Sequence, residues 1–266
     1  MKETFKKLIP DLVAIIFFVF LSLGYFASEI SENKVLNQHD SQTGIGTGQE
    51  AAAYKKATGE TTRWTNSSFS GMPTYQISPS YDSTNLIKKV QNLYDLFLPA
   101  PANLVFMMLL GFYILLRAFG CRPMVSALGA VMYALSSYFF ILIQAGHIWK
   151  FITLAYIPPT IAGIVLAYNK KYLLGGIVTA FFLAMQILSN HMQMTYYFAF
   201  VILFLAIAYF IDAIHKKELP HFFKASGVLI IAALIGVSIN LSTMYHTYEY
   251  SKQTMRGKSE LQQNVE

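Results

Sequence analysis

The chain has 266 residues, of which 55% are hydrophobic and only 13% are charged, whereas an ordinary soluble domain has about 25% charged residues. Several apolar runs reach about 18 residues, the length that crosses a hydrocarbon core of about 30 Å, which excludes a soluble globular protein. The net charge of +6 does not indicate nucleic-acid binding, because the basic residues lie largely at the ends of the apolar runs. The single cysteine, Cys121, excludes an intrachain disulfide.

Seven apolar segments in chain order predict seven transmembrane helices. They cover residues 8–27, 100–117, 123–143, 151–168, 172–189, 195–213 and 223–243. Basic residues cluster beside alternate ends of these segments, in four groups: Lys2, Lys6 and Lys7; Arg117 and Arg122; Lys170 and Lys171; and Lys216, Lys217 and Lys224. When all four groups are placed in the cytoplasm, the positive-inside rule is satisfied throughout. We therefore expect an all-α, multi-pass integral membrane protein with a cytoplasmic N-terminus.

This topology divides the chain into four parts. Residues 1–27 are a cytoplasmic tip and the first span, and residues 28–99 form a large extracytoplasmic loop. Residues 100–243 form a bundle of six spans, and residues 244–266 are an outer tail. A cleaved signal peptide is an alternative for the first span, because it has a basic start and ends in "YFAS". The loop lies outside the cytoplasm in either case.

The outer loop has three predicted elements. A short helix is expected over residues 47–58, with Thr47 as N-cap, Glu50 at the third helical position and Gly59 as terminator. Gly, Pro and Ser punctuate residues 63–77, which predicts a loop or hairpin.

The third element is an amphipathic helix over residues 83–98. Its apolar residues recur every three or four positions, and Lys88, Lys89, Asn92 and Asp95 occupy the other side. We expect this helix to lie in the membrane interface.

Asp40 is the first candidate catalytic residue. It lies about thirteen residues beyond the first span, so that it should stay near the membrane surface. Its carboxylate could act as a general base, or bind a metal together with His39, and Glu50 could join it if the loop folds back. The alternative is an ordinary solvated aspartate or a helix N-cap.

Two short outer turns hold further candidates. The turn "GHIWK" carries His147 and Lys150, and this lysine is an exception to the charge bias. It could pair with a phosphate, or extend from the membrane beside the anchoring Trp149. The turn "NHMQMTYY" carries His191 and Gln193, which could line a polar cavity or simply complete a hydrogen-bonded turn.

Helical spacing makes a cavity the better prediction for these turns. Gln186 lies one helical turn from Asn190, and Gln144 and His147 are spaced in the same way. Two polar stripes thus open toward the outer face. In the tail, Arg256 and Lys258 could neutralise a phosphate or be merely solvated.

The stretches "QHDSQTG", "WTNSSFSGMPTYQI", "GHIWKFITLAYIPPTIAG", "SNHMQMTYY" and "YSKQTMRGKSEL" together resemble the N-terminal part of the YfhO-like bacterial membrane proteins. That family is similar to the GT-C class of glycosyltransferases, which take a sugar from a polyprenyl-phosphate carrier on the outer leaflet. The resemblance implies a place in the bacterial inner (cytoplasmic) membrane and a catalytic carboxylate soon after the first span, at Asp40, with Glu50 as a weaker candidate. Family members are longer, which implies that this chain is a truncated piece.

The resulting hypothesis is an inverting glycosyltransferase. Asp40 would activate the acceptor, Lys150 with Arg256 or Lys258 would stabilise the leaving phosphate, and His39, His147, His191 and Gln193 would shape the substrate site. Its partners would be a polyprenyl-phosphate-linked sugar, membrane lipid and a polysaccharide, lipid or protein acceptor of the cell envelope, with no nucleic acid. No cofactor is required, although a divalent cation is compatible. The alternatives are a transporter or flippase for a lipid-linked substrate, and a non-catalytic envelope-assembly protein.

Overall fold

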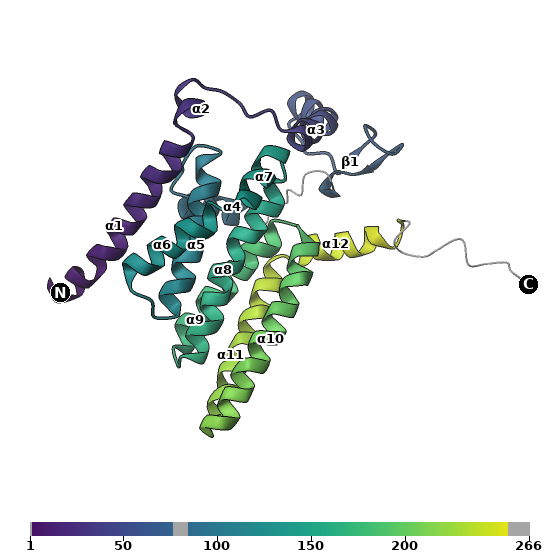
Figure 1. Ribbon diagram of the computed structural model, residues 1–266. Coiled ribbons are helices and arrows are strands. Elements are labelled where there is room, and N and C mark those ends of the chain that lie inside the picture. Colours follow the sequence, from purple (N-terminus) through teal and green to yellow (C-terminus); the bar gives the residue numbers. More distant parts are fainter. Residues whose placement is uncertain (1, 77–84, 255–266) are drawn as a thin grey trace, which may run out of the picture.

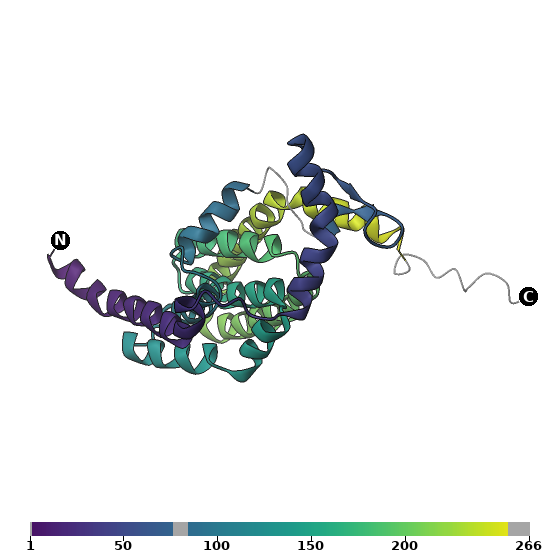
Figure 2. The same cartoon turned by 90° about the horizontal axis from the view of Figure 1, so that it is seen from above.

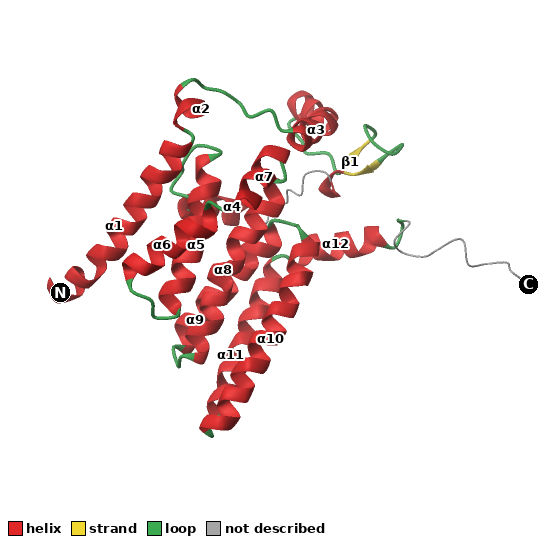
Figure 3. Ribbon diagram, viewed as in Figure 1, coloured by secondary structure: helices red, strands yellow, loops and turns green. Residues whose placement is uncertain are grey.

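The computed structural model describes residues 2–76 and 85–254, and this part of the chain is almost entirely helical. The helices are α1 (Lys2–Tyr25), α2 (Ala27–Ser31), α3 (His39–Thr58), α4 (Asn85–Tyr94), α5 (Ala102–Ala118), α6 (Pro123–Ala134), α7 (Ser137–Ala145), α8 (Ile148–Tyr168), α9 (Tyr172–Leu188), α10 (Met192–Lys216), α11 (Leu219–Ile239) and α12 (Leu241–Ser251). Two short strands, β1 (Trp64–Thr65) and β2 (Met72–Pro73), pair antiparallel, and a 3-10 turn, η1 (Thr74–Gln76), follows them. Figure 3 shows how small the strand content is.

Each predicted apolar segment is mostly helical, but the expected count of seven spans is not confirmed. Four helices are long and apolar enough to cross a membrane: 8–25 within α1, and the whole of α8, α10 and α11. Helices α6 and α7 would form a fifth span only as a pair, since they are bent by 47° at their junction. Helices α5 and α9 are apolar but only 17 residues long. Hydropathy located the segments correctly, but it did not show where the helices end or break.

Helix α8 lies at the centre of the bundle, between α5 and α9. In the apolar stretch of α8, 78% of the residues are buried inside the protein, compared with 11–17% in the other three candidate spans. Protein therefore leaves most of the apolar surface of those three helices uncovered. Close packing against α9 depends on small residues, because a Cβ atom added at Gly163 or Gly175 would overlap backbone atoms of the facing helix. Pro158 and Pro159 lie within α8 and are buried.

The two ends of the bundle differ in what covers them (Figure 1). Helix α3 and the β1–β2 hairpin lie across one end, which we call the α3 end, and the α7–α8 connection lies beneath α3. The α8–α9 and α10–α11 connections lie at the other end, which we call the opposite end. Seen from above, α3 crosses the edge of the bundle toward the hairpin and α12 (Figure 2). The basic 170–171 and 216–217 connections thus share the opposite end, as the charge pattern predicted, while its cytoplasmic orientation stays a prediction.

The first helix predicted in the 28–99 segment is longer than expected. Helix α3 begins at His39, eight residues before the expected N-cap Thr47, and it continues through the glycines of "GIGTG". The hydroxyl of Thr47 does not cap a helix but donates to carbonyl oxygens of its own preceding turn. The predicted terminator is confirmed, because Gly59 adopts the left-handed conformation with φ of 78°.

The remaining predicted elements of the 28–99 segment are confirmed in part. The expected hairpin is confirmed by the β1–β2 pair, while Ile77 lies outside the described residues. The amphipathic helix is shorter than predicted, because α4 ends at Tyr94. Asp95, expected on the polar side, is only 4% exposed and accepts hydrogen bonds from the Nδ2 of Asn103 (3.2 Å) and the backbone N–H of Phe97 (3.1 Å). A tight turn after α4 therefore turns this carboxylate into the protein.

Candidate functional site

The first turn of α3 is fixed against the α7–α8 connection. Gln38, the residue before the helix, donates from its Nε2 to the carbonyl oxygen of Ile143 at 2.5 Å. Its Oε1 accepts a bond from the Ser41 hydroxyl at 2.9 Å. Gly146 leaves room for this approach, because a Cβ atom there would lie 3.0 Å from the backbone nitrogen of Ser41. These contacts join segments about a hundred residues apart in the chain, and they determine where Asp40 lies.

Asp40 contacts two imidazoles. Its Oδ2 lies 2.8 Å from the Nδ1 of His147, and its Oδ1 lies 3.5 Å from the Nδ1 of His39. The His39 side chain is 92% exposed and points to solvent, whereas Asp40 is 50% exposed at the rim of a hollow. The Nδ1 of His147 donates to the carboxylate in this arrangement, which orients both side chains without removing the carboxylate from water.

A hollow of about 480 Å³ opens at this point, within the size range of small-ligand sites. It brings together the four predicted residues Asp40, His147, Lys150 and His191. The other lining residues come from the first two turns of α3, from the α7–α8 connection and from the start of α8: Ser41, Gly44, Ile45, Gly146, Ile148 and Trp149. The lining residues therefore converge from α3, from the α7–α8 connection, from the start of α8 and from His191 directly before α10.

The electrostatics of the hollow favour an anionic or polar ligand. Among the described residues Lys150 forms no ion pair, and its ammonium lies 5.6 Å from the centroid of the Tyr138 ring. Burial lowers the pKa of His191, and the neighbouring Lys150 ammonium and His147 imidazole lower it further. The buried Nδ1 of His191 has no hydrogen-bond partner in the described part of the chain. The hollow thus offers one unpaired cation and one unused imidazole nitrogen.

Three other predicted residues lie elsewhere. Glu50 faces the hairpin, where its carboxylate accepts bonds from the Thr65 hydroxyl (2.6 Å) and the backbone N–H of Asn66 (2.8 Å). These bonds lower its pKa, the Thr65 bond most strongly, and they fasten α3 to the hairpin. Gln193 donates to the Tyr197 hydroxyl at 3.0 Å on the exposed surface, and His39 points outward. Arg256 and Lys258 lie outside the described residues.

Sequence reasoning missed the contribution of α3 beyond Asp40. Gly44 and Ile45 line the hollow one turn further along, and their i+4 and i+5 spacing from Asp40 would have indicated this if the helix had been predicted to begin at His39. Gln38 was not singled out, although its side chain anchors the helix start. A single polar residue before a helix carries no signal of a contact with a distant turn.

Metal binding finds no support in the clustering of side chains. No three His, Cys, Asp or Glu residues within 2–76 and 85–254 gather closely enough to hold a metal ion. The chain matches no known protein-family description, no curated protein and no solved structure in the three comparisons. The resemblance to the YfhO-like and GT-C proteins therefore stays a prediction.

Proposed function

We propose that this chain forms the donor-side active site of a GT-C-type membrane glycosyltransferase of the bacterial inner membrane. In this proposal it transfers a sugar from a polyprenyl-phosphate donor to a cell-envelope acceptor on the extracytoplasmic face. The single observation that carries the proposal is the gathering of Asp40, His147, Lys150 and His191 around one hollow at the α3 end of an apolar bundle. A donor with a polar headgroup and a long apolar chain suits a polar hollow that borders membrane-spanning helices.

The proposed general base is Asp40. The acceptor hydroxyl oxygen attacks the anomeric carbon, its proton passes to the Asp40 carboxylate, and the bond from the anomeric carbon to the phosphate oxygen breaks. The bond from the Nδ1 of His147, at 2.8 Å, orients the carboxylate for this transfer. General-base assistance of this kind contributes about 10²–10⁴-fold to a rate. The 50% exposure of Asp40 leaves the carboxylate open to an incoming hydroxyl.

The proposed role of Lys150 concerns the leaving group. When the sugar–phosphate bond breaks, the carrier phosphodiester becomes a monoester and gains negative charge. An ammonium without a carboxylate partner stabilises that added charge more than one that is already neutralised. The buried, unpartnered Nδ1 of His191 offers a further polar contact to the phosphate or the sugar.

The test is transfer of labelled sugar in bacterial membranes that contain the full protein. Undecaprenyl phosphate carrying [¹⁴C]glucose, mannose or galactose is supplied in turn, and label in envelope material is counted. Asp40→Asn is expected to lower transfer by about 10²-fold or more, because the general base is lost while the shape is kept. Lys150→Gln is expected to lower it too, whereas the control Lys252→Gln, directly after α12, should leave it unchanged.

Two results would oppose the proposal. Wild-type transfer by a correctly folded Asp40→Asn variant would remove the general base from the mechanism. Counterflow of the labelled lipid across proteoliposomes without any glycosylated product would identify a transporter instead.

A further inference from the structure

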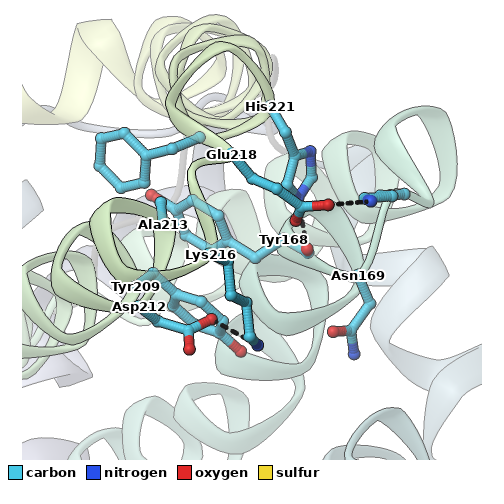
Figure 4. A pocket seen from close by; sticks show the side chains of 10 residues that line it. Tyr168, Asn169, Tyr209, Asp212, Ala213, Lys216, Glu218 and His221 are labelled. Atoms are coloured by element: carbon cyan, nitrogen blue, oxygen red, sulfur yellow. Dashed lines mark hydrogen bonds and ion pairs between the residues drawn. The ribbon is translucent and has the colours of Figure 1, made fainter.

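A second hollow lies at the opposite end of the bundle, where α8 and α10 end and α11 begins (Figure 4). Its volume is about 350 Å³, and it lies apart from the Asp40 hollow. Charged side chains surround it with both signs represented: Lys170, Lys216, Asp212 and Glu218. The proposed glycosyltransferase mechanism uses none of these residues.

The charges of this hollow are balanced. The ammonium of Lys170 lies 2.8 Å from a carboxylate oxygen of Glu218, and that of Lys216 lies 2.8 Å from one of Asp212. All four side chains remain between about two-fifths and two-thirds exposed, so that each can take an additional partner. Such a hollow attracts a ligand that carries one positive and one negative group more than it attracts a purely anionic ligand, because each lysine already faces a carboxylate.

Hydrogen bonds and ring stacking hold the wall between the two ion pairs. His221 Nε2 donates to the carbonyl oxygen of Tyr168 at 2.7 Å, so its Nδ1, 2.6 Å from the Tyr172 hydroxyl oxygen, accepts from that hydroxyl when the imidazole is neutral. The Tyr168 ring stacks on Tyr209, with centroids 4.2 Å apart and an interplanar angle of 18°. A site held in this way loses little side-chain freedom when a ligand binds.

An apolar hollow of about 300 Å³ adjoins the polar one at Tyr168 and lies toward the middle of the bundle. Tyr168 lines both hollows, and the deeper one extends along α8 as far as Thr160, about 12 Å away at 1.5 Å per residue. That depth approaches half of a hydrocarbon core of about 30 Å. Ile202 of α10 and Leu229 of α11 are among its apolar lining residues.

A pair of hydroxyls lies at the apolar hollow's polar end. The Tyr168 hydroxyl and the Ser226 hydroxyl are 3.0 Å apart, and both residues line the apolar hollow. Their mutual bond uses one of the two hydroxyl hydrogens, so the other can be donated to an acceptor such as an ester carbonyl.

We propose that the two hollows form one site for a zwitterionic phospholipid whose headgroup carries a primary ammonium, a phosphatidylethanolamine. The lipid ammonium donates to the carboxylates of Asp212 and Glu218, and the phosphate binds Lys170 and Lys216. A fatty-acid ester carbonyl takes the spare hydrogen of the Tyr168–Ser226 pair, and one acyl chain fills the apolar hollow. This site is independent of the proposed sugar transfer.

The test is a lipid titration of the full chain, purified in a maltoside detergent and measured by native mass spectrometry. Matched acyl chains are used on phosphatidylethanolamine, phosphatidylcholine and phosphatidylglycerol. Wild type is expected to bind the ethanolamine lipid most tightly, because choline cannot donate hydrogen bonds and glycerol carries no positive charge. Asp212→Asn combined with Glu218→Gln is expected to weaken that binding by about tenfold, in line with the loss of a charge-assisted hydrogen bond.

Two further variants separate this site from general effects. Glu249→Gln breaks the similarly exposed Lys252–Glu249 pair, whose atoms are 2.6 Å apart, and should not change lipid binding. Ala233→Phe fills the apolar hollow, which Ala233 lines, and should weaken all three lipids while the headgroup preference persists.

Three results would overturn the proposal. The first is tightest binding of phosphatidylglycerol, and the second is equal binding of all three lipids. The third is displacement of bound lipid by glycerophosphoethanolamine, which has no acyl chains, at the same concentration that intact phosphatidylethanolamine requires. That third result would mean that the apolar hollow contributes nothing to binding. The wild-type preference and Ala233→Phe keep the proposal testable if the double variant does not fold.

Discussion

Gly146→Ala tests how α3 is held over the α7–α8 connection. Gly146 has φ of +85°, so an alanine there costs about 1 kcal/mol from the left-handed backbone alone. The new methyl group would also lie 3.0 Å from the backbone nitrogen and 3.0 Å from the hydroxyl of Ser41, and 3.1 Å from the Cβ of Gln38. Backbone atoms cannot rotate away, so we expect a further cost of about 1–2 kcal/mol, in the lower part of the range for overpacking.

Gly120→Ala is the matched control for this substitution. Gly120 has the same φ of +85°, but nothing lies within 4 Å of the position of its Cβ atom. Equilibrium unfolding in mixed micelles should show a loss of about 1 kcal/mol for the control and about 2–3 kcal/mol for Gly146→Ala. Hydrogen exchange should also rise in the first turn of α3 in Gly146→Ala alone. Equal losses in the two variants, with unchanged exchange, would refute this account of how Asp40 is positioned.

Three further predictions follow from single contacts. Glu50→Gln should release the hairpin from α3 and increase quenching of Trp64 fluorescence. In the wild type, acidification should cause the same release, because the pKa of Glu50 is lowered in the folded state. A carboxyl group of this kind contributes stability that is lost as the pH falls through its folded-state pKa. The pKa of His191 is lower in the folded protein than in the unfolded protein, so protons bind the unfolded protein more readily. The free energy of unfolding should therefore fall from pH 7 to pH 5, and His191→Gln should make this fall smaller. Gly175→Ala should lower the free energy of unfolding by about 1–3 kcal/mol, since its methyl group would meet the backbone of α8, whereas Gly227→Ala, with open space around it, should not.

The bundle was largely predictable from the sequence, because long apolar runs have few structural solutions in a membrane. The exact spans were not: the two serines of "ALSSY" are compatible with a helix N-cap, but serines also occur within membrane helices, so they do not by themselves predict the break between α6 and α7 at Leu135–Ser136. Helix α3 was predicted too short, because the glycines of "GIGTG" lower intrinsic helix propensity by about 1 kcal/mol each relative to alanine. The contact of Gln38 with Ile143 at the helix start is non-local and leaves no trace in the local pattern.

Four of the residues singled out in the sequence line one hollow, but its geometry was not predicted, and Glu50, Gln193 and His39 lie elsewhere. Charge bias and turn length indicated that His147, Lys150 and His191 share one membrane boundary with Asp40. The 2.8 Å contact between Asp40 and His147 depends on the docking of α3, which no periodicity encodes. Glu50 shows the converse, because spacing alone could not distinguish a second catalytic carboxylate from one that fastens α3 to a hairpin.

The central claim is that Asp40 and the two histidine turns share one ligand site. Asp40→Cys and Lys150→Cys, each in a Cys121→Ser background, should react with a membrane-impermeant maleimide from the same side of the membrane. Undecaprenyl phosphate should slow both reactions, and it should leave the control variant Phe69→Cys unaffected, since the Phe69 side chain is 90% exposed between β1 and β2 and does not line the Asp40 hollow. Labelling from opposite sides, or protection of neither position, would contradict the claim.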